Sequence, residues 1–347
     1  MKRKRIQNVR SRVIQRTLSL LLILAVALFV SDPISWAGNV DVNGDGVVNT
    51  ADLEFVDARI GATGQNPADV NDDNVVNIVD LMLVKNAIGT RTTGPVGSVD
   101  GMVLIPAGDF QMGSNSGSSD ERPVHTVYVD AFYMDKYEVT NAEYKKFVDA
   151  NPQWQKGRIE RRFHNGYYLH SWNGNNYPAG KGDHPVVYVS WYAAMAYSKW
   201  AGKRLPTEAE WEKAARGGLV GKVYPWGDTI DATRANYSRN VGSTAPVGSY
   251  PPNVYGLYDM VGNVWEWCLD EYQTGFYSNS PHQNPVAGGQ PVNILLDNYT
   301  GVNTLRVLRG GSWYNYARYV RVASRFRNDP TYSNDGLGFR CARAVTP

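Results

Sequence analysis

Two stretches near the start of the chain place oxygen-bearing side chains at intervals that suit a calcium ion. The segments 41–61 (DVNGDGVVNTADLEFVDARIG) and 69–89 (DVNDDNVVNIVDLMLVKNAIG) repeat one another. Calcium is a hard cation that takes about six to eight oxygen ligands, and a loop of about 12 residues with this spacing wraps around one ion. The sequence therefore predicts two Ca²⁺ sites, with Asp41, Asn43, Asp45, the Val47 carbonyl, Asn49 and Asp52 as ligands in the first loop and Asp69, Asn71, Asp73, the Val75 carbonyl, Asn77 and Asp80 in the second.

A short helix must follow each loop, because the last ligand of each loop begins a run of apolar residues at helical spacing. These residues are Leu53, Val56 and Ile60 after the first loop, then Leu81, Val84 and Ile88 after the second. Gly46 supplies the sharp turn of the first loop, and Asn74, which tolerates the left-handed conformation, replaces it in the second. Residues 38–90 are thus predicted to form a small all-α module.

This duplicated loop and helix closely resembles the dockerin module, over residues 39–89. The resemblance implies docking to a cohesin-like partner and an association with polysaccharide degradation. A calcium-stiffened spacer without a partner is the structural alternative, since a motif is only a hypothesis about use.

The first 37 residues predict export from the cell. Seven basic residues and one acid precede or flank the apolar run from Leu18 to Val30, and Ser35-Trp36-Ala37 follows it. This is the pattern of a secretory signal peptide, and the run is shorter than the about 20 residues that span a membrane. We therefore expect a secreted or cell-surface protein with no membrane span after cleavage; an uncleaved anchor is the alternative.

The charge of the chain changes when this segment is removed. The formal net charge of the whole sequence is +2, and it becomes negative without the basic first 37 residues. With no basic patch in the remainder, we expect no nucleic-acid partner. Residues 91–99 are predicted to be a linker by their composition of Thr, Gly, Pro and Ser.

Residues 100–347 are predicted to form an irregular α+β domain. Short strands alternate apolar and polar residues, at Val127 and Val129 and at Phe132 and Met134. Two capping boxes predict helices, one from Thr140 to about Ala150 and one that opens at Thr207 and closes at Gly217-Gly218. Ser190 is predicted to cap a third helix over 191–201.

Six blocks of this domain occur in the order found in the formylglycine-generating enzyme, or sulfatase-modifying factor, family. They are MVLIPAGDFQMGS (102–114), the segments 120–148 and 184–218, YPWGD (224–228), YGLYDMVGNVWEW (255–267), and LRGGSW with GFRCAR (308–343). The resemblance implies a variant of the C-type lectin fold that is often stiffened by calcium. It implies one further Ca²⁺ site within DMVGNVWE, with the side chains of Asp259 and Glu266 and the carbonyls of Gly262 and Val264 as ligands.

The known chemistry of that family requires copper held by two cysteines, the first of them three residues after the Gly-Gly-Ser turn. Here Asn315 stands at the first position, and the second falls near Tyr319 and Val320. Copper(I) needs soft thiolates, so we expect no copper and name no catalytic residue. The five histidines, His125, His164, His170, His184 and His282, show no ligand spacing for iron. Glu208, Glu210 and Glu212 are assigned to capping and solvation.

The family also implies a role for the two cysteines. Cys341 lies in the strand that usually carries a structural disulfide, but the position of its usual partner is Ser198. Cys268 could replace that partner, so a Cys268–Cys341 disulfide is expected; two buried thiols are the alternative.

Aromatic and amide side chains gather after the Gly-Gly-Ser turn, in the segment that frames the family's substrate groove. Tyr and Trp offer rigid contact area, and Asn adapts its hydrogen bonds. We expect a surface that binds a peptide or glycan, on a domain without the family's enzymatic activity. The alternatives are core packing of half these residues, or a diverged oxidoreductase that modifies proteins. The expected binding residues are Trp313, Tyr314, Asn315, Tyr316 and Tyr319, with Asn328, Tyr332, Asn334 and Asp335 nearby.

Overall fold

The computed structural model describes residues 101–345 and, in the N-terminal part, residues 42, 50–63, 68–69, 76, 80–81 and 84–85. The chain divides into two compact units, residues 1–84 and 85–347. The predicted signal peptide (1–37) and linker (91–99) lie outside the described residues. Within the described residues, no helix has the length and apolar character needed to span a membrane.

The N-terminal unit contains helix α2 (Thr50–Asp57), at the place where a helix was predicted after the first loop. The two repeats contact each other through the backbone: the Gly61 N–H donates to the Val76 carbonyl at 2.8 Å, and the Val76 N–H donates to the Ala62 carbonyl at 2.8 Å. Three of the predicted calcium ligands, Asp52, Asp69 and Asp80, are described and buried. The others lie outside the described residues: Asp41, Asn43, Asp45, Val47, Asn49, Asn71, Asp73, Val75 and Asn77.

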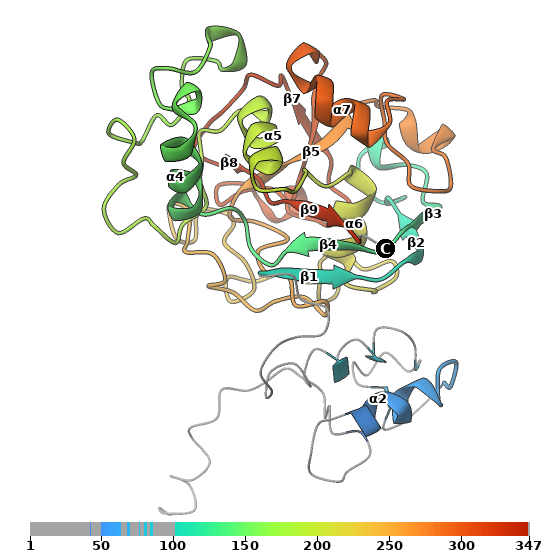
Figure 1. The fold of residues 1–347 in the computed structure, drawn as a ribbon. Coiled ribbons are helices and arrows are strands. Elements are labelled where there is room, and N and C mark those ends of the chain that lie inside the picture. Colours follow the sequence, from blue (N-terminus) through green and yellow to red (C-terminus); the bar gives the residue numbers. More distant parts are fainter. Residues whose placement is uncertain are drawn as a thin grey trace, which may run out of the picture. The chain divides into compact units, whose positions relative to one another are not determined.

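The larger unit is built on small sheets with helices around them (Figure 1). One sheet has the strand order β1-β4-β9, a second pairs β2 with β3, and the third has the order β7-β6-β5-β8. The strands are β1 (Met102–Ile105), β2 (Gly108–Met112), β3 (His125–Val129), β4 (Phe132–Asp135), β5 (Trp265–Glu271), β6 (Arg306–Arg309), β7 (Phe326–Asn328), β8 (Leu337–Gly338) and β9 (Ala342–Ala344). The β5–β8 pair is parallel, whereas β5 runs antiparallel to β6. The domain is thus of the predicted α+β class.

The predicted helices are present with their predicted caps. Thr140 and Thr207 each form a complete capping box, and Gly217 ends its helix in the left-handed conformation with φ of 59°. Ser190 accepts a hydrogen bond from the Ala193 N–H. The α-helices of this unit are α4 (Asn141–Ala150), α5 (Trp191–Trp200), α6 (Glu208–Arg216) and α7 (Val292–Asn298).

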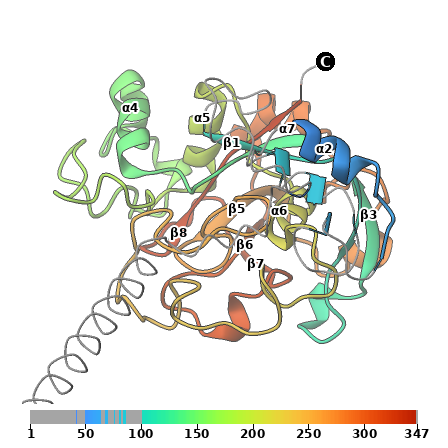
Figure 2. The same cartoon turned by 90° about the horizontal axis from the view of Figure 1, so that it is seen from below.

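Aromatic side chains make up much of the core between α4, α5 and the third sheet. Tyr144 on α4 stacks on Tyr197 of α5 at 5.5 Å between ring centroids, and Phe339 lies against both rings. Trp267 of β5 is fully buried in the same cluster. In Figure 2, β5 and β6 run through the middle of the unit, with α4 at its rim and α6 near the centre. Of these two strands, β6 leads directly into the Gly-Gly-Ser turn at Gly310.

Candidate functional site

The turn after β6 is fixed by its glycines. All four residues of β6 are buried, and Gly310 and Gly311 then take φ of 90° and 76°. A Cβ atom on Gly311 would lie 2.4 Å from Cγ1 of Val320 and 2.9 Å from the Tyr319 carbonyl oxygen. Only glycine combines this backbone conformation with such a close approach, so the two ends of the turn pack directly on each other.

Asn315 closes this turn with its side chain. Its Oδ1 atom accepts hydrogen bonds from the Ser312 N–H at 3.0 Å and from the Ser312 hydroxyl at 2.6 Å. Asparagine commonly bonds to nearby backbone in this way at turns. The residue at the position where a copper thiolate is expected by resemblance thus forms hydrogen bonds within the turn.

A second loop holds the turn in place from outside. The Ser238 N–H donates to the Asn315 carbonyl at 2.8 Å, and the Arg239 N–H donates to the Trp313 carbonyl at 2.7 Å. Both donors are non-glycine residues in the left-handed region, with φ of 50° and 61°. Such conformations cost of order 1–3 kcal/mol and persist only where the surroundings enforce them. The turn is therefore a rigid platform.

Of the five expected binding residues, two form an exposed patch. Tyr316 and Tyr319 are 64% and 42% exposed, and the Arg318 guanidinium lies 4.6 Å from the Tyr319 ring centroid and 5.6 Å from that of Tyr316. We call Tyr316, Arg318 and Tyr319 the turn face. Stacking on Arg restrains both rings, and this favours a surface prepared for contact.

The other expected residues support the turn face and are half-buried. The Trp313 indole N–H donates to the Asp335 carbonyl at 3.1 Å, and the Asn334 amide donates to the Tyr314 hydroxyl at 3.1 Å. Their rings meet edge to face at 5.1 Å. The segment 332–335 therefore braces the turn. Asn328 belongs to β7, which pairs with the far side of β6.

A buried charge network lies behind the turn, and here the sequence-based assignment was wrong. Glu208 and Glu212 were assigned to solvation, but they are 1% and 0% exposed. The Arg309 guanidinium forms ion pairs with both carboxylates, and Arg325 donates to Glu208 at 2.6 and 2.8 Å. Burial raises the pKa of the Glu212 carboxyl, but Arg216 and Arg309 outweigh it, so the pKa is lowered. Glu210 does form its predicted cap and also pairs with Arg204.

The network orients the chain that follows the turn face. Arg309 donates to the carbonyls of Val322 at 2.8 Å and Ala323 at 3.2 Å, and Arg321 pairs with the buried Glu121 at 2.6 Å. Residues 321–323, which follow the turn face, are thus attached both to β6 and to η1 (Ser119–Glu121). Single buried arginines carry no sequence signal that separates them from surface arginines, so this support could not be read from the chain.

Asp270 on β5 adds an uncompensated buried carboxyl near this network, and we expect it to make stability depend on pH. Burial, and then the neighbouring Glu208, raise its pKa from 3.8 to about 7. Because the folded state keeps this proton to higher pH than the unfolded state, stability should fall as the pH rises from about 4 to about 7 and stay level above. Unfolding in urea at pH 4.5 and pH 8 measures the change, which is on the order of 2–4 kcal/mol for this one group.

Asp270→Asn separates this effect from the rest of the protein. The variant loses one acceptor for the Glu208 or Ala287 N–H, which bond to the two carboxyl oxygens at 2.7 and 2.8 Å. That loss lowers stability equally at both pH values. The difference in the free energy of unfolding between pH 4.5 and pH 8 should therefore be smaller in the variant than in the wild-type chain. An unchanged difference would refute the assignment to Asp270.

The expected Ca²⁺ site within DMVGNVWE fits the structure only in part. Asp259 accepts from the Gly248 N–H at 2.7 Å through Oδ2 and borders a small cavity of about 10 Å³. Arg234 also lines that cavity, whereas Gly262 and Val264 do not. Glu266 does not fit, because Arg340 donates to both its oxygens at 2.7 and 2.8 Å and the Trp211 indole N–H donates to Oε2. Gly262 approaches the Asn236 carbonyl so closely that a Cβ would lie 2.4 Å from its oxygen. The Val264 N–H donates to Glu138, a buried carboxylate that sequence reasoning missed.

The expected disulfide is absent, since Cys268 and Cys341 are both free and buried. The Cys341 thiol lies 3.3 Å from the Ser198 hydroxyl on α5. Trp267 and Leu269 belong to the same aromatic core as Cys341. Neighbouring residues on a strand point to opposite faces, so Cys268, which lies between these two, faces away from that core toward the Glu208–Arg309 network. The alternative of two buried thiols is correct.

No histidine-based metal centre is formed by the described residues, and in them no group of three or more His, Cys, Asp or Glu is placed to hold an ion. His282 pairs with Asp109 at 2.8 Å, and His184 bonds to Thr244 at 3.1 Å. These two histidines therefore act as hydrogen-bonding side chains.

The fold and the turn define a C-type-lectin-like domain of mixed helix and sheet. Residues 88–345 match the sulfatase-modifying factor enzyme 1-like domain. The chain belongs to this family. It is 38% identical to the formylglycine-generating enzyme of Streptomyces coelicolor, over 71% of this chain and 90% of that protein. It is 36% identical to the inactive C-alpha-formylglycine-generating enzyme 2 of Bos taurus, over 71% and 89%.

Other relatives share only this domain or only the fold. The chain is 40% identical to the serine/threonine-protein kinase Pkn1 of Chlamydia trachomatis, over 70% of this chain but 38% of that protein. The chain thus spans about two fifths of the length of the Pkn1 relatives it matches. Among solved structures, PvdO of Pseudomonas aeruginosa is 28% identical with a TM-score of 0.55, covering 70% of this chain and 94% of PvdO. Treponema denticola variable protein 1 is 28% identical with a TM-score of 0.52, covering 73% and 99%.

Proposed function

We propose that the large domain is a ligand-binding module and that the turn face is its contact surface for a peptide or glycan. The observation that carries this proposal is the pairing of two exposed tyrosines, Tyr316 and Tyr319, with a backbone that two glycines and a second loop hold rigid. Large exposed aromatic side chains on rigid backbone favour binding, because little conformational entropy is lost on contact.

The same turn argues against copper-dependent formylglycine formation. Similarity alone does not decide the matter, since the chain is 38% identical to an active relative and 36% identical to one named inactive. The chemistry of the side chain at position 315 supports the proposal, because an amide cannot replace a thiolate as a ligand for copper(I). The Oδ1 atom of Asn315 moreover already accepts two hydrogen bonds from Ser312.

The N-terminal unit would attach this module to a larger assembly. We propose that the protein is exported and that its duplicated loops bind two Ca²⁺ ions and dock to a cohesin-like partner, in the setting of polysaccharide degradation. The support for this proposal is the repeated spacing of oxygen-bearing side chains in the two loops, which suits one calcium ion per loop. We propose a third Ca²⁺ ion beside Asp259, with the carbonyls of Gly262 and Val264 and without Glu266.

Replacing both Tyr316 and Tyr319 by alanine is expected to abolish ligand binding and leave the fold unchanged. Each exposed ring that forms the centre of a contact contributes about 2 kcal/mol, or about 30-fold in affinity, so the double variant should bind about several hundredfold more weakly. Arrays of glycans and of secreted peptides, probed with the purified chain, identify the ligand, and titration then measures the affinity.

Trp200→Ala is the matched control for this experiment. Trp200 is 44% exposed at the C-terminal end of α5, where it lies against Phe147 and Tyr197. Its loss removes an exposed aromatic ring outside the turn face and should leave binding intact. An array that detects no ligand for the wild-type chain, or a double variant that binds normally, would contradict the proposed function.

A diverged protein-modifying enzyme is the second candidate, favoured by the 90% coverage of the Streptomyces coelicolor enzyme. It requires a redox-active metal that is bound without the cysteine pair. Stoichiometric copper or iron in the purified protein, with conversion of a cysteine-containing peptide, would favour this candidate over the binding module.

A further inference from the structure

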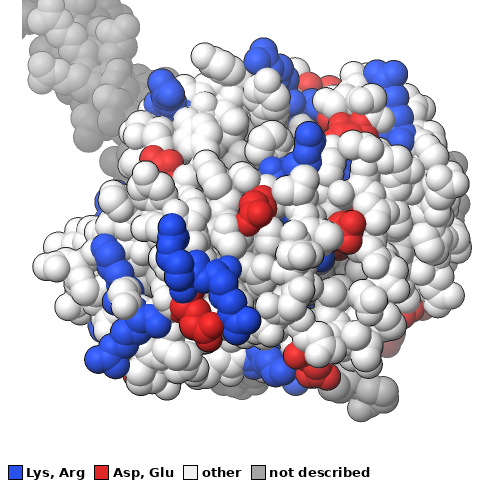
Figure 3. Space-filling view, turned by 90° about the horizontal axis from the view of Figure 1, so that it is seen from above, with Lys and Arg blue, Asp and Glu red and all other residues white. Residues whose placement is uncertain are grey.

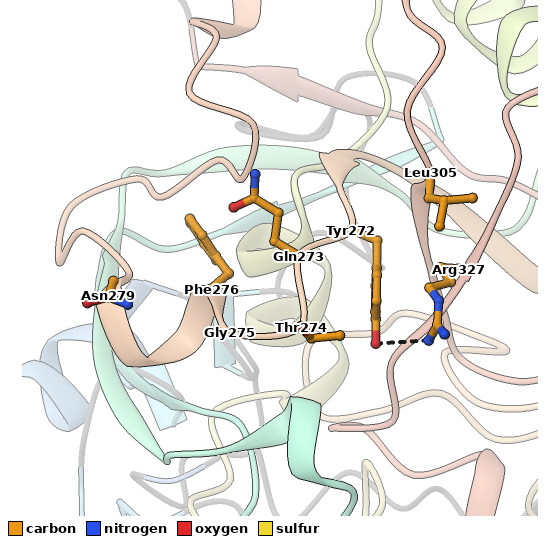
Figure 4. A pocket seen from close by; sticks show the side chains of 8 residues that line it. All are labelled: Tyr272, Gln273, Thr274, Gly275, Phe276, Asn279, Leu305 and Arg327. Atoms are coloured by element: carbon orange, nitrogen blue, oxygen red, sulfur yellow. Dashed lines mark hydrogen bonds between the residues drawn. The ribbon is translucent and has the colours of Figure 1, made fainter.

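An open groove of about 610 Å³ lies at the far ends of β5 and β6 (Figure 4). Its walls come from three places in the chain: the segment after β5, the residue before β6, and β7. We call it the Arg327 groove, after the cation on its wall. The lining residues that matter here are Tyr272, Gln273, Phe276, Asn279, Leu305 and Arg327. Its volume is within the range of about 300–1,000 Å³ found for small-ligand sites.

Arg327 is exposed and held in one orientation. Its guanidinium lies 4.6 Å from the ring centroid of Tyr272, and Nη1 donates to the Tyr272 hydroxyl at 3.1 Å. That hydroxyl in turn donates to Asp120 at 2.7 Å. The two side chains point toward each other across the groove wall in Figure 4. The stack fixes the guanidinium plane, so its remaining N–H groups are oriented before any ligand arrives.

The charge of Arg327 differs from that of neighbouring arginines in lacking a direct partner. Arg321 pairs with Glu121 at 2.6 Å, and Arg325 pairs with Glu208 at 2.6 Å. Over the described residues, by contrast, no carboxylate lies within ion-pair distance of Arg327, and Asp120 reaches it only through the Tyr272 hydroxyl. On the face seen in Figure 3, acidic and basic side chains are interspersed. An oriented, unpaired guanidinium in a groove is a receptor for a carboxylate.

The remaining walls suit a sugar ring. Leu305 is 43% exposed, and Phe276 is half-buried, so both offer apolar faces to the C–H face of a pyranose. Gln273 and Asn279 are exposed amides at the rim, able to donate to and accept from hydroxyl groups. The groove is open along its length, so it can receive one or two residues of a longer chain.

We propose that the Arg327 groove binds a carboxylate-bearing sugar, that is, a uronic acid residue of an acidic glycan. Arg327 takes the carboxylate, Phe276 and Leu305 contact the ring, and Gln273 and Asn279 contact the hydroxyls. This site is separate from the turn face and does not depend on its function. The amides and the two apolar walls favour a sugar over an acidic peptide, which would need backbone partners along the groove.

Titration calorimetry with a galacturonate trisaccharide tests the proposal, with the neutral galactose trisaccharide as the matched probe. The wild-type chain is expected to bind the acidic trisaccharide at least about tenfold more tightly than the neutral one. Arg327→Gln should remove this difference, and Arg327→Lys should keep only part of it, since lysine cannot form the forked contact. Phe276→Ala should weaken both probes equally.

The control variant is Arg162→Gln, which removes an arginine side chain that is 66% exposed and pairs with Glu160. It should bind as the wild-type chain does, and thermal unfolding of all variants checks that the fold is retained. Four results would overturn the proposal: no binding of the acidic trisaccharide at millimolar concentration, equal binding of both probes, unchanged binding by Arg327→Gln, or Arg327-dependent binding of a polyglutamate peptide in place of the sugar.

Discussion

Replacing Glu212 by alanine is expected to lower the free energy of unfolding by about 3–5 kcal/mol. This carboxylate is completely buried on α6 and accepts from Arg216 at 2.6 and 2.9 Å, from the Gly113 N–H at 2.7 Å, and from Arg309. Removing it leaves two buried guanidinium groups with too little negative charge. An unpaired buried cation costs far more than the ion pair itself contributes.

Urea unfolding measures this difference, with Glu160→Ala as the control. Glu160 also pairs with an arginine, but its side chain is 63% exposed, and exposed pairs contribute about 0–1 kcal/mol. The two variants therefore remove the same chemical group from a buried and an exposed pair. Equal, small effects of both substitutions would show that the network around Glu212 does not support the domain.

Replacing Gly311 by alanine is expected to destabilise the protein and to distort the turn face. A left-handed conformation costs a residue with a Cβ about 1–2 kcal/mol. The new Cβ would in addition lie 2.9 Å from the backbone oxygen of Tyr319, which cannot move without shifting the turn. We therefore expect a loss of at least about 2 kcal/mol, together with weaker ligand binding by Tyr316 and Tyr319.

Gly301→Ala provides the comparison for Gly311. No atom lies within 4 Å of a Cβ built on Gly301, and its φ is outside the left-handed region. This substitution should change stability by less than about 1 kcal/mol. A Gly311→Ala variant as stable as Gly301→Ala, with normal ligand binding, would mean that the turn does not need its glycines.

Local signals in the sequence predicted the secondary structure of the domain well, because each depends on residues close in the chain. The capping boxes at Thr140 and Thr207 and the cap at Ser190 lie where the helices begin. The alternation at Val127 and Val129 marks the buried face of β3. The ordered blocks of the family led to the correct fold, since they span most of the domain.

Long-range pairing could not be read from the sequence. Glu208 and Glu212 looked like solvated residues because Arg309 and Arg325, which form ion pairs with them, are about 100 residues away in the chain. Of their arginine partners, only Arg216 is close in sequence. Cys268 and Cys341 looked like partners because nothing in the chain shows that they face different sides of β5. The Arg327 groove was missed for the same reason, as its walls come from segments with no shared pattern.

Metal content of residues 38–347, the chain without its predicted signal peptide, tests the central claim most directly: that this domain has kept the family scaffold and lost its copper chemistry. The purified chain is incubated with copper(I) and micromolar calcium, dialysed, and measured by mass spectrometry of the elements. We predict about three calcium ions per chain and no retained copper or iron, as expected for hard oxygen ligands without a thiolate pair. Copper or iron near one ion per chain would contradict the account and favour an oxidase.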